Sequence, residues 1–478
     1  KTRQHLEWAA VLDALSHQCQ SEVGISMART LDFASDLHTL SRSQTRTSEA
    51  RQLLDNDVPV SVGPLFDVRE AVKRAQRGSQ MDPESLVAAG RLLETTRRVM
   101  ETIEVAPGAP EITALCAPLF ADIRLEHELI DVFDENFELM NHASPKLRSL
   151  RQQADDFRSN LKRTLNRYLT DEDILPLLQE DYFTLRDERY VLPLKARHKN
   201  HVEGIVHGWS KTGSTVYVEP ARVIEANNKL MLAQAETESE VNRILDQLSR
   251  KVGANAKALN ENFETLAQLD LILAMGRFSQ QLDATQPEIS NDGQLKLEQF
   301  RHPLLVLSDE PVMPNSMALT REQPALVITG PNTGGKTVAL KSAGLLILMA
   351  HAGLHIPATQ GSRVPFVPGV FSDIGDEQSL ESKHSTFSGP IHNLNQIIKT
   401  VAPGSVVLLD ELVVGTDPGQ GSALAQALAE HFVDQGCFLI ITTHYENLKC
   451  LALDDQRFRN AAMGIEGETS KPTYRLTL

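Results

Sequence analysis

The fold of the last third of the chain is decided by an apolar run, residues 325–329, followed by Gly330-Pro331-Asn332-Thr333-Gly334-Gly335-Lys336-Thr337. The run has the composition of a buried strand, and the helical stretch 338–350 follows the glycine-rich segment. The eight residues match G-x-x-x-x-G-K-[ST], a loop that wraps phosphates when it joins a strand to a helix. We therefore predict a nucleotide-binding α/β domain.

Each residue type in this loop has a chemical reason to be there. Glycines allow backbone N–H groups to turn toward phosphates, and the following helix presents its positive end to them. Lys336 is expected to reach the outer phosphates as a point charge. Thr337 is expected to give its hydroxyl to Mg²⁺. We predict that ATP with Mg²⁺ binds through Gly330, Pro331, Asn332, Thr333, Gly334, Gly335, Lys336 and Thr337.

The second half of this site is expected downstream, where the apolar run 406–409 ends in Asp410-Glu411. Asp410 is placed to hold Mg²⁺, through water. Glu411 is placed to act as the general base that polarises the attacking water. His444 follows the apolar run 438–442, and strand ends in such sheets face the ligand. We predict that His444 senses the γ-phosphate, against the plainer possibility of a structural histidine.

Continuous apolar runs alternate with helical stretches from residue 301 onward, which is typical of a parallel sheet buried on both faces. Within this region Asp417 is predicted to cap a helix and Pro418 to begin it. The segment Ser385-Thr386-Phe387-Ser388 lies between the two halves of the site. Its residue types suit either a helix cap or a phosphate contact, and the pattern leaves both open.

The remainder of the chain is predicted to be mainly helical. Residues 1–145 read as helices joined by short loops. An apolar stripe at steps of three and four from Leu147 to Tyr168 indicates a long helix close to a coiled-coil seam, and a second stripe runs from Leu230 to Val252. Between them the period changes to two, so a small β element at about 182–220 is expected between the long helices.

The charge distribution restricts where nucleic acid can bind. The formal net charge is -16, which excludes a chain coated for nucleic acid. From Arg186 to Lys211, however, the segment contains six cationic side chains and only three carboxylates. We predict phosphate contacts in this β element, although a sheet edge protected by lysine explains the same residues. The candidates are Lys195, Arg197, Lys199 and Lys211.

Composition also indicates a compartment. The four cysteines form no C-x-x-C pair, so buried free thiols are expected and a zinc site is not. No apolar run approaches the length of a membrane span, and the N-terminus has no signal-peptide core. We predict a cytoplasmic protein that does not bind membranes.

Taken together, several of these motifs resemble the MutS family of ABC-type ATPases, and the resemblance covers essentially the whole chain. It rests on residues 330–337, Ser385-Thr386-Phe387, Asp410-Glu411, Gly415-Thr416 and Thr443-His444-Tyr445. Three further segments are similar to the second bacterial branch, whose members usually carry a C-terminal Smr domain. These are residues 373–379, Gly415-Thr416-Asp417-Pro418 and Arg189-Tyr190-Val191-Leu192-Pro193-Leu194-Lys195.

The resemblance implies a division of labour along the chain. Residues 1–145 would form the core and lever, 146–260 the clamp arm, 261–300 the returning lever helix and linker, and 301–478 the ABC-type ATPase domain. The protein would be a homodimer in which Ser385 reaches the γ-phosphate bound to the other subunit. Val413-Val414 and Gly389-Pro390 depart from the branch pattern and are expected to slow hydrolysis or loosen the dimer.

Some properties of the family are not expected here. The mismatch-reading N-terminal domain of true MutS proteins has no counterpart, so specific mismatch recognition is not predicted. The sequence stops at Leu478, before the dimerisation tail and Smr domain of the branch. The nuclease reaction associated with that domain is therefore not assigned to these residues.

Three functions fit these observations. The first is a DNA clamp of the MutS family that acts on branched or non-standard DNA, restrains recombination and assists repair, with ATP hydrolysis driving clamp opening and closing. The second is a ribosome-associated, rRNA-binding ATPase that splits stalled, collided ribosomes for quality control. The third is a nucleotide-gated binding module with little turnover. Among the residues above, Glu411 favours turnover.

Overall fold

The computed structural model describes residues 1–290, 292–308, 311–375, 388–412, 418–465 and 472–478. The chain divides into two compact units that are discontinuous in sequence. The first unit comprises residues 1–66, 98–119 and 263–478, and the second comprises residues 67–97 and 120–262. The chain crosses between the units four times, outside helices after Phe66 and Leu119 and within the helices α6 (Pro83–Val105) and α11 (Ala256–Gln281). A mixed α/β, multidomain chain is thus confirmed.

A six-stranded sheet organises the first unit, in the order β10-β11-β12-β8-β13-β14. The strands from β10 to β13 are parallel, and β14 runs antiparallel to β13 at the edge. The sequence predicted the bounds of β8 and β12 correctly, and β11 extends one residue further to include Asp410. The strands are β8 (Ala325–Thr329), β10 (Val370–Asp373), β11 (Val406–Asp410), β12 (Phe438–Thr442), β13 (Phe458–Ile465) and β14 (Pro472–Thr477).

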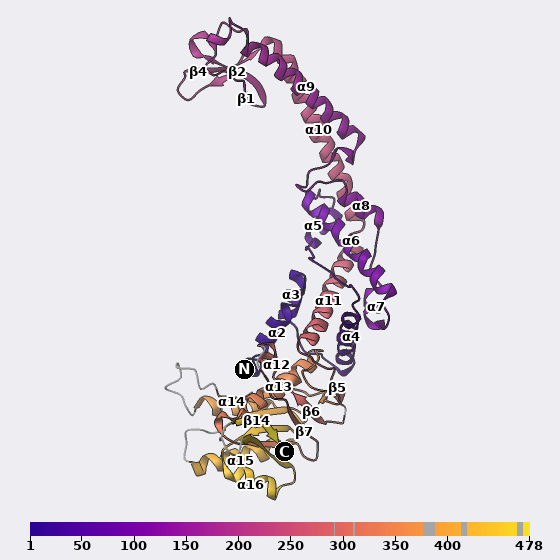
Figure 1. Cartoon of the computed structure of the whole chain (residues 1–478), viewed down its shortest axis with the longest axis vertical. Coiled ribbons are helices and arrows are strands. Elements are labelled where there is room, and N and C mark those ends of the chain that lie inside the picture. The colour runs from indigo at the N-terminus through magenta and orange to yellow at the C-terminus, as the bar shows by residue number, and fades with distance from the viewer. Residues whose placement is uncertain (291, 309–310, 376–387, 413–417, 466–471) are drawn as a thin grey trace. The chain divides into compact units, whose positions relative to one another are not determined.

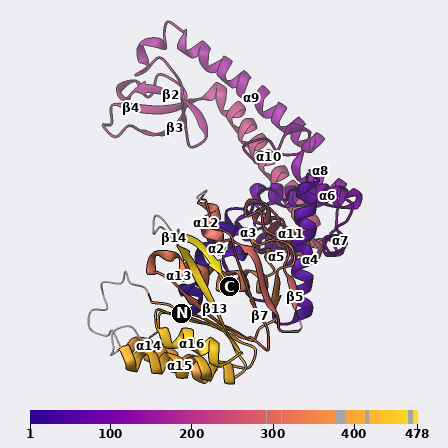
Figure 2. The same ribbon diagram turned by 60° about the horizontal axis from the view of Figure 1, so that its bottom comes forward.

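Helices cover both faces of this sheet, as continuous apolar strands require. On one face, Leu326, Leu408 and Ile440 pack in the same core as α13 (Lys336–His351). On the other, Val327, Leu409 and Ile441 pack with α14 (Ser388–Thr400), α15 (Pro418–Asp434) and α16 (Glu446–Asp454). Figure 2 shows α15 and α16 lying side by side beneath the strands. The sheet is therefore buried, and only strand ends are free to form a site.

Helix α13 is held unusually close to the sheet. Thirteen of its sixteen residues are buried, which is typical of a helix enclosed within a core. A Cβ atom added at Gly344 would lie 2.3 Å from Leu408 Cδ1, so only glycine permits this approach. The C-terminal end of α13 is satisfied by α4 (Leu37–Asp55), where Gln44 Nε2 donates to the carbonyls of Ala350 (2.8 Å) and Leu354 (3.0 Å). The helix that begins at the glycine loop is thus held by close packing at its middle and by α4 at its C-terminal end.

The rest of the first unit supports the large sheet. A four-stranded sheet has the order β5-β9-β6-β7. Its strands are β5 (Glu288–Ser290), β6 (Leu295–Phe300), β7 (Asn315–Leu319) and β9 (Arg363–Pro365). The smaller helices are α1 (Thr2–His5), α2 (Trp8–Ser16), α3 (Glu22–Arg29), α7 (Pro110–Cys116) and α12 (Pro303–Leu307). No helix in the described part of the chain is both long enough and apolar enough to cross a membrane.

The second unit is built around two long helices, α9 (Pro145–Leu169) and α10 (Ala221–Ala254), which run side by side in Figure 1. The predicted stripe on α9 is the packed face, because Leu147, Leu150, Ala154, Leu161 and Leu165 are buried. Ser144 caps the start of α9 by accepting from the amides of Lys146 and Leu147. The shorter helices of this unit are α5 (Arg69–Gln76) and α8 (Ile123–Ile130).

The predicted β element follows α9 and precedes α10 in the sequence, and it forms a sheet in the order β1-β2-β4-β3. Its strands are β1 (Thr184–Arg186), β2 (Arg189–Lys195), β3 (Gly204–Trp209) and β4 (Thr215–Pro220). Glu219, with no exposed surface, accepts from Arg189 (2.8 Å) and Asn227 (2.8 Å), and lies 2.7 Å from His207 Nε2. Because a buried carboxylate is costly without partners, this network fixes the sheet to the start of α10.

Candidate nucleotide site

The carboxyl ends of three adjacent strands bring the predicted residues together. Strand β12 lies between β8 and β11, and its Thr442 is in register with both Asp410 and Ile328. The glycine loop, residues 330–335, follows β8, while Glu411 follows β11 and His444 lies just beyond β12. Segments more than 70 residues apart in sequence therefore share one edge of the sheet.

The glycine loop has the conformation that its sequence requires. Gly330 and Gly335 adopt φ values of 132° and 88°, which side chains strongly disfavour. Residues Asn332–Gly334 form a short 3-10 turn, flanked by Pro331 and containing the exposed Thr333. Gly335 directly precedes α13, whose first-turn amides have no partner within the helix. The loop thus turns into a helix N-terminus, an arrangement suited to anions.

Lys336 is the most deeply buried charge of the site, with 1% of its side chain exposed. Its Nζ donates to the carbonyl of Gly330 at 2.8 Å and lies 2.9 Å from Glu411 Oε1. A buried ammonium requires such partners, because desolvation without them is prohibitive. Lys336, predicted to bind the phosphates, and Glu411, predicted to act as the general base, therefore contact each other.

Asp410 is held by two hydroxyl groups. Thr337 Oγ1 donates to Asp410 Oδ2 at 2.8 Å, and Thr442 Oγ1 donates to Asp410 Oδ1. These bonds place the two predicted Mg²⁺ ligands, Thr337 and Asp410, in direct contact. Hydroxyl and carboxylate oxygens are the donors that Mg²⁺ prefers, so the residues fit this ion.

The backbone of Glu411 is fixed in an uncommon conformation. Its φ of 45° is left-handed, a region that residues other than glycine rarely occupy. The amide of Glu411 donates to both the carbonyl (3.2 Å) and the hydroxyl (3.0 Å) of Thr442. Thr442 thus holds the turn after β11 and aims the Glu411 carboxylate at Lys336.

His444 is placed at the same edge but faces solvent. It is exposed, and its ring lies 4.4 Å from the ring of Tyr445 between centroids. The preceding Thr443 is buried and accepts a hydrogen bond from the amide of Tyr445. His444 is therefore available to a ligand at the strand ends, and its role as a phosphate sensor stays a prediction.

Sequence reasoning missed two residues of the site. Thr442 is the only residue with a hydroxyl group in the run 438–442, and it forms hydrogen bonds with both Asp410 and Glu411. A polar residue ending an apolar strand was the available signal. Tyr474 is half exposed and has a φ of 56°. Its Cδ1 atom would lie 3.1 Å from a Cβ atom added at Gly335. No local pattern connects Tyr474, on β14, with the glycine loop.

Other predicted residues lie outside the part of the chain that the structure describes. These are Ser385, with the rest of the Ser-Thr-Phe segment, and residues 413–417, which include Val413-Val414 and the predicted cap Asp417. Helix α15 begins at Pro418, where the sequence predicted it. Gly389 and Pro390 lie within α14.

The predicted nucleic-acid contacts are spread over the β element of the second unit. Lys195 ends β2 and donates to the carbonyl of Pro176 at 2.9 Å. Arg197 donates to His198 Nε2 at 3.0 Å. Lys199 lies over the half-exposed ring of Trp209, 5.6 Å from its centroid, and Lys211 is in the exposed turn after β3. The four cations are accessible but do not form one cluster through shared contacts.

Comparison with known proteins places this chain. Residues 326–478 match the model of MutS domain V. The chain is 38% identical over 478 residues to a protein named Endonuclease MutS2 from Symbiobacterium thermophilum. The chain is therefore similar over its whole length to the MutS family. Similar relatives of the same name occur in Pelotomaculum thermopropionicum (38% identity) and Bacillus velezensis (35%).

All three alignments cover 100% of this chain, and the shared name agrees with the second bacterial branch that the motifs indicated. The chain spans 60% of the length of the Symbiobacterium relative and 61% of the other two. The MutS domain V match begins within β8 and includes the glycine loop, Asp410, Glu411 and His444.

Proposed function

We propose that this chain is a MutS-family ATPase whose nucleotide site is the edge formed by the glycine loop, Asp410 and Glu411. The observation that carries the proposal is the contact of Lys336 with Glu411 at 2.9 Å, beside the contact of Thr337 with Asp410 at 2.8 Å. Four side chains with the required chemistry thus lie at one helix N-terminus. A glycine turn with a purely structural role would not need a buried lysine.

The residues suit ATP with Mg²⁺. The loop amides and Lys336 would hold the phosphates, and Thr337 and Asp410 would hold Mg²⁺, which neutralises phosphate charge when bound. Tyr474 offers an aromatic face beside Gly335 on which a base could stack. In hydrolysis, Glu411 would accept a proton from a water molecule. The oxygen of that water would bond to the γ-phosphorus as the bond between the γ-phosphorus and ADP breaks. Lys336 would stabilise the departing charge, and His444 would contact the γ-phosphate.

We further propose that ATP turnover opens and closes a nucleic-acid clamp that acts on branched DNA and restrains recombination. The relatives' shared name, which describes an endonuclease, supports nucleic acid as the ligand. In this proposal residues 1–145 are core and lever, 146–260 the clamp arm, 261–300 the returning helix and linker, and 301–478 the ATPase. The protein acts as a homodimer, with Ser385 completing the partner's site.

Phosphate release tests the ATPase. Wild type and Glu411→Gln are compared at equal folding, with bound nucleotide measured in parallel. We expect Glu411→Gln to bind ATP and to release phosphate at least 100-fold more slowly, as about 10²–10⁴ of rate comes from general-base catalysis. Lys336→Ala should bind little nucleotide. Equal phosphate release by wild type and Glu411→Gln would remove Glu411 as the base.

Competition tests the ligand. Glu411→Gln loaded with ATP and Mg²⁺ is offered four-way-junction DNA and stalled disomes together. Preference for junctions, lost with Lys336→Ala, supports the DNA clamp, whereas preference for disomes would replace it with the ribosome-splitting function. Sedimentation with and without ATP, and with Ser385→Arg, tests the homodimer; a monomer in every condition contradicts it.

A further inference from the structure

The two long helices of the second unit carry their charges differently. Helix α10 has five cations and five carboxylates, and four of its cations form ion pairs. These are Lys229 with Glu225, Arg243 with Glu240, Arg250 with Asp246, and Lys251 with Glu128. Helix α9 has seven cations and only two carboxylates, Asp155 and Asp156. The excess of positive charge is therefore confined to α9.

Most cations of α9 have no carboxylate partner. Lys146 pairs with Glu240 at 3.5 Å and Arg158 with Asp155 at 2.7 Å. Within the described residues, no ion pair is formed by the other five, which are Arg148, Arg151, Lys162, Arg163 and Arg167. In a chain of net charge -16, such uncompensated cations stand out against a background that repels anions.

Four cations share one side of the helix, which we call the α9 basic flank: Arg148, Arg151, Arg158 and Lys162. At 3.6 residues per turn, these positions fall within about 80° of arc. At 1.5 Å per residue they extend over about 21 Å of helix. Nucleic acid presents one phosphate per roughly 3.4 Å of axis on each strand, so the flank matches about six phosphates.

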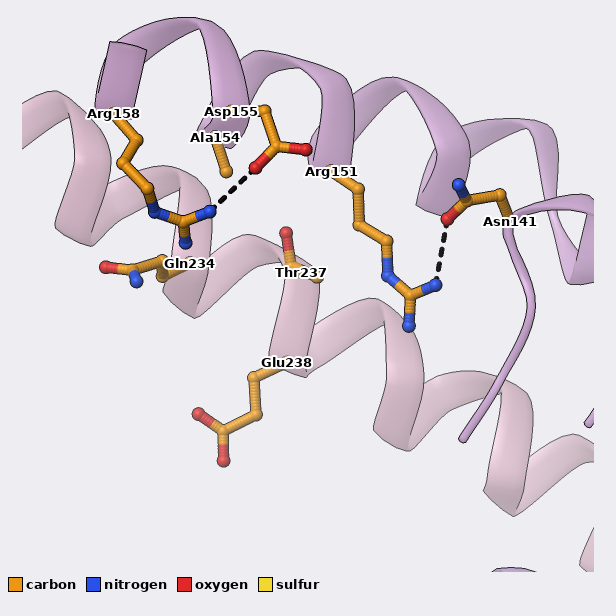
Figure 3. A pocket seen from close by; sticks show the side chains of 8 residues that line it. All are labelled: Asn141, Arg151, Ala154, Asp155, Arg158, Gln234, Thr237 and Glu238. Carbon is orange, nitrogen blue, oxygen red and sulfur yellow. Dashed lines mark hydrogen bonds and ion pairs between the residues drawn. The ribbon is translucent and has the colours of Figure 1, made fainter. Parts of the chain in front are cut away.

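The two central arginines line a groove of about 380 Å³ between α9 and α10. Figure 3 shows Arg151 and Arg158 leaving α9 on the same side and extending toward α10, with Asp155 between them. Arg151 Nη1 donates to Asn141 Oδ1 at 2.8 Å, and Arg158 Nη1 donates to Asp155 Oδ1 at 2.7 Å. Each guanidinium uses one donor and keeps others for a ligand. This preorganisation lowers the entropy lost on binding.

The carboxylates of the groove set its limits. Asp155 lies within the basic flank, but its contact with Arg158 orients that arginine. Glu238 lines the α10 side of the groove and would repel a phosphate there. Anion binding is therefore favoured along α9 and disfavoured on α10. The small side chain of Ala154, buried against Ala233, lets the helices approach and forms the floor.

We propose that the α9 basic flank binds the sugar-phosphate backbone of a nucleic-acid duplex, as a second contact apart from the β element. This inference rests on the proposed nucleic-acid clamp and adds a site to it. Contacts of this kind fix position along a duplex without reading its sequence. DNA and RNA duplexes offer the same phosphate chemistry, so both are used as probes.

The test removes charge from the flank in the full chain. Arg148→Gln, Arg151→Gln and Lys162→Gln are combined, since glutamine keeps helix propensity. The matched control combines Lys229→Gln, Arg250→Gln and Lys257→Gln, which removes the same charge from exposed, paired positions of the same unit. Binding to a 30-base-pair DNA duplex and to an RNA duplex of equal length is measured across a salt series.

We expect the flank variant to reduce the slope of log Kd against log salt by about two to three for its preferred duplex, because each phosphate contact contributes about 0.9. The control variant should keep the wild-type slope. A variant that combines Arg148→Lys with Arg151→Lys keeps the charge of the flank and should bind the duplex nearly as well as wild type. It therefore separates the effect of charge from any effect on folding. The duplex with the larger loss identifies the source of the phosphates.

Two results would overturn the inference in different ways. If the flank and control variants have equal slopes while wild type binds, the flank is only a solvated face, and the nucleic-acid clamp itself stands. If wild type binds neither duplex nor junction DNA in any nucleotide state, the flank and the clamp both fail.

Discussion

Lys336 Nζ lies 2.9 Å from Glu411 Oε1. The lysine predicted to bind phosphate and the glutamate predicted to polarise the attacking water therefore neutralise each other's charge. The pair joins the start of α13 to the end of β11. Phosphates that bind the loop as proposed would have to compete with Glu411 for Lys336. In the proposed ATPase, the same displacement would free the Glu411 carboxylate for a water molecule and so couple nucleotide binding to hydrolysis.

Glu411→Gln should therefore bind ATP more tightly than wild type. The substitution removes the negative competitor for Lys336, worth about 1 kcal/mol for a partly exposed pair, or about fivefold in affinity. Equilibrium titration with a labelled nucleotide measures this. Glu446→Gln, a change to an exposed glutamate on α16, is the control and should match wild type. Unchanged or weaker ATP binding by Glu411→Gln would mean that the ion pair does not oppose the nucleotide.

Thr442→Val should slow hydrolysis and raise the Mg²⁺ concentration required for it. Valine removes the hydroxyl that donates to Asp410 and accepts from the Glu411 amide, so both groups lose their orientation. Groups that orient metal ligands typically contribute about 10–100-fold. Ser405→Ala is the matched control, because it removes a buried hydroxyl just before β11, at the opposite end of the sheet. An equal Mg²⁺ dependence in both variants would exclude the role of Thr442.

Gln44→Ala should destabilise the first unit. It leaves the carbonyls of Ala350 and Leu354 without their side-chain donor in a buried region, at a cost of about 2 kcal/mol. Chemical denaturation monitored for this unit measures the loss. Ser41→Ala, at an exposed position of the same helix, should change stability by less than about 0.5 kcal/mol. Similar losses in the two variants would show that the contact with α13 is not stabilising.

Acid should destabilise the first unit through His355. Burial, together with nearby Arg51, lowers the pKa of His355 from 6.5 to about 4. Below pH 6.5 the unfolded chain therefore binds a proton that the folded chain refuses, so stability falls as pH drops from about 6.5 toward 4. The full effect is up to about 3 kcal/mol. His302, whose pKa burial also lowers to about 4, acts in the same direction.

The variant His355→Gln should lose less stability over this pH range than wild type, and the double variant with His302→Gln should lose least. Unfolding free energies measured from pH 4.5 to 7.5 give the slopes. Glutamine retains hydrogen bonding toward Ser48 and Ser279, which lie 2.8 Å from the two ring nitrogens of His355. Parallel pH curves for wild type and both variants would contradict this origin of acid sensitivity.

The sequence predicted individual elements of the site better than their partners. The bounds of β8 and β12 and the loop that follows β8 were predicted correctly. In the second unit, the predicted β element starts at Thr184, the first residue of β1, instead of at about residue 182. Short strands have weak local signals, because pairing with neighbours fixes where each one begins and ends.

By itself, the sequence determined the strand, loop and helix around Lys336, because apolar runs and glycines at positive φ impose local conformations. The chemistry of Asp410 and Glu411 was likewise readable from residue types. Tertiary structure decided which groups meet: Lys336 with Glu411, Thr442 with Asp410, and Arg151 with Asn141. Such contacts depend on strand order and on helix pairing. Both are fixed by burial of the whole core, which no local pattern encodes.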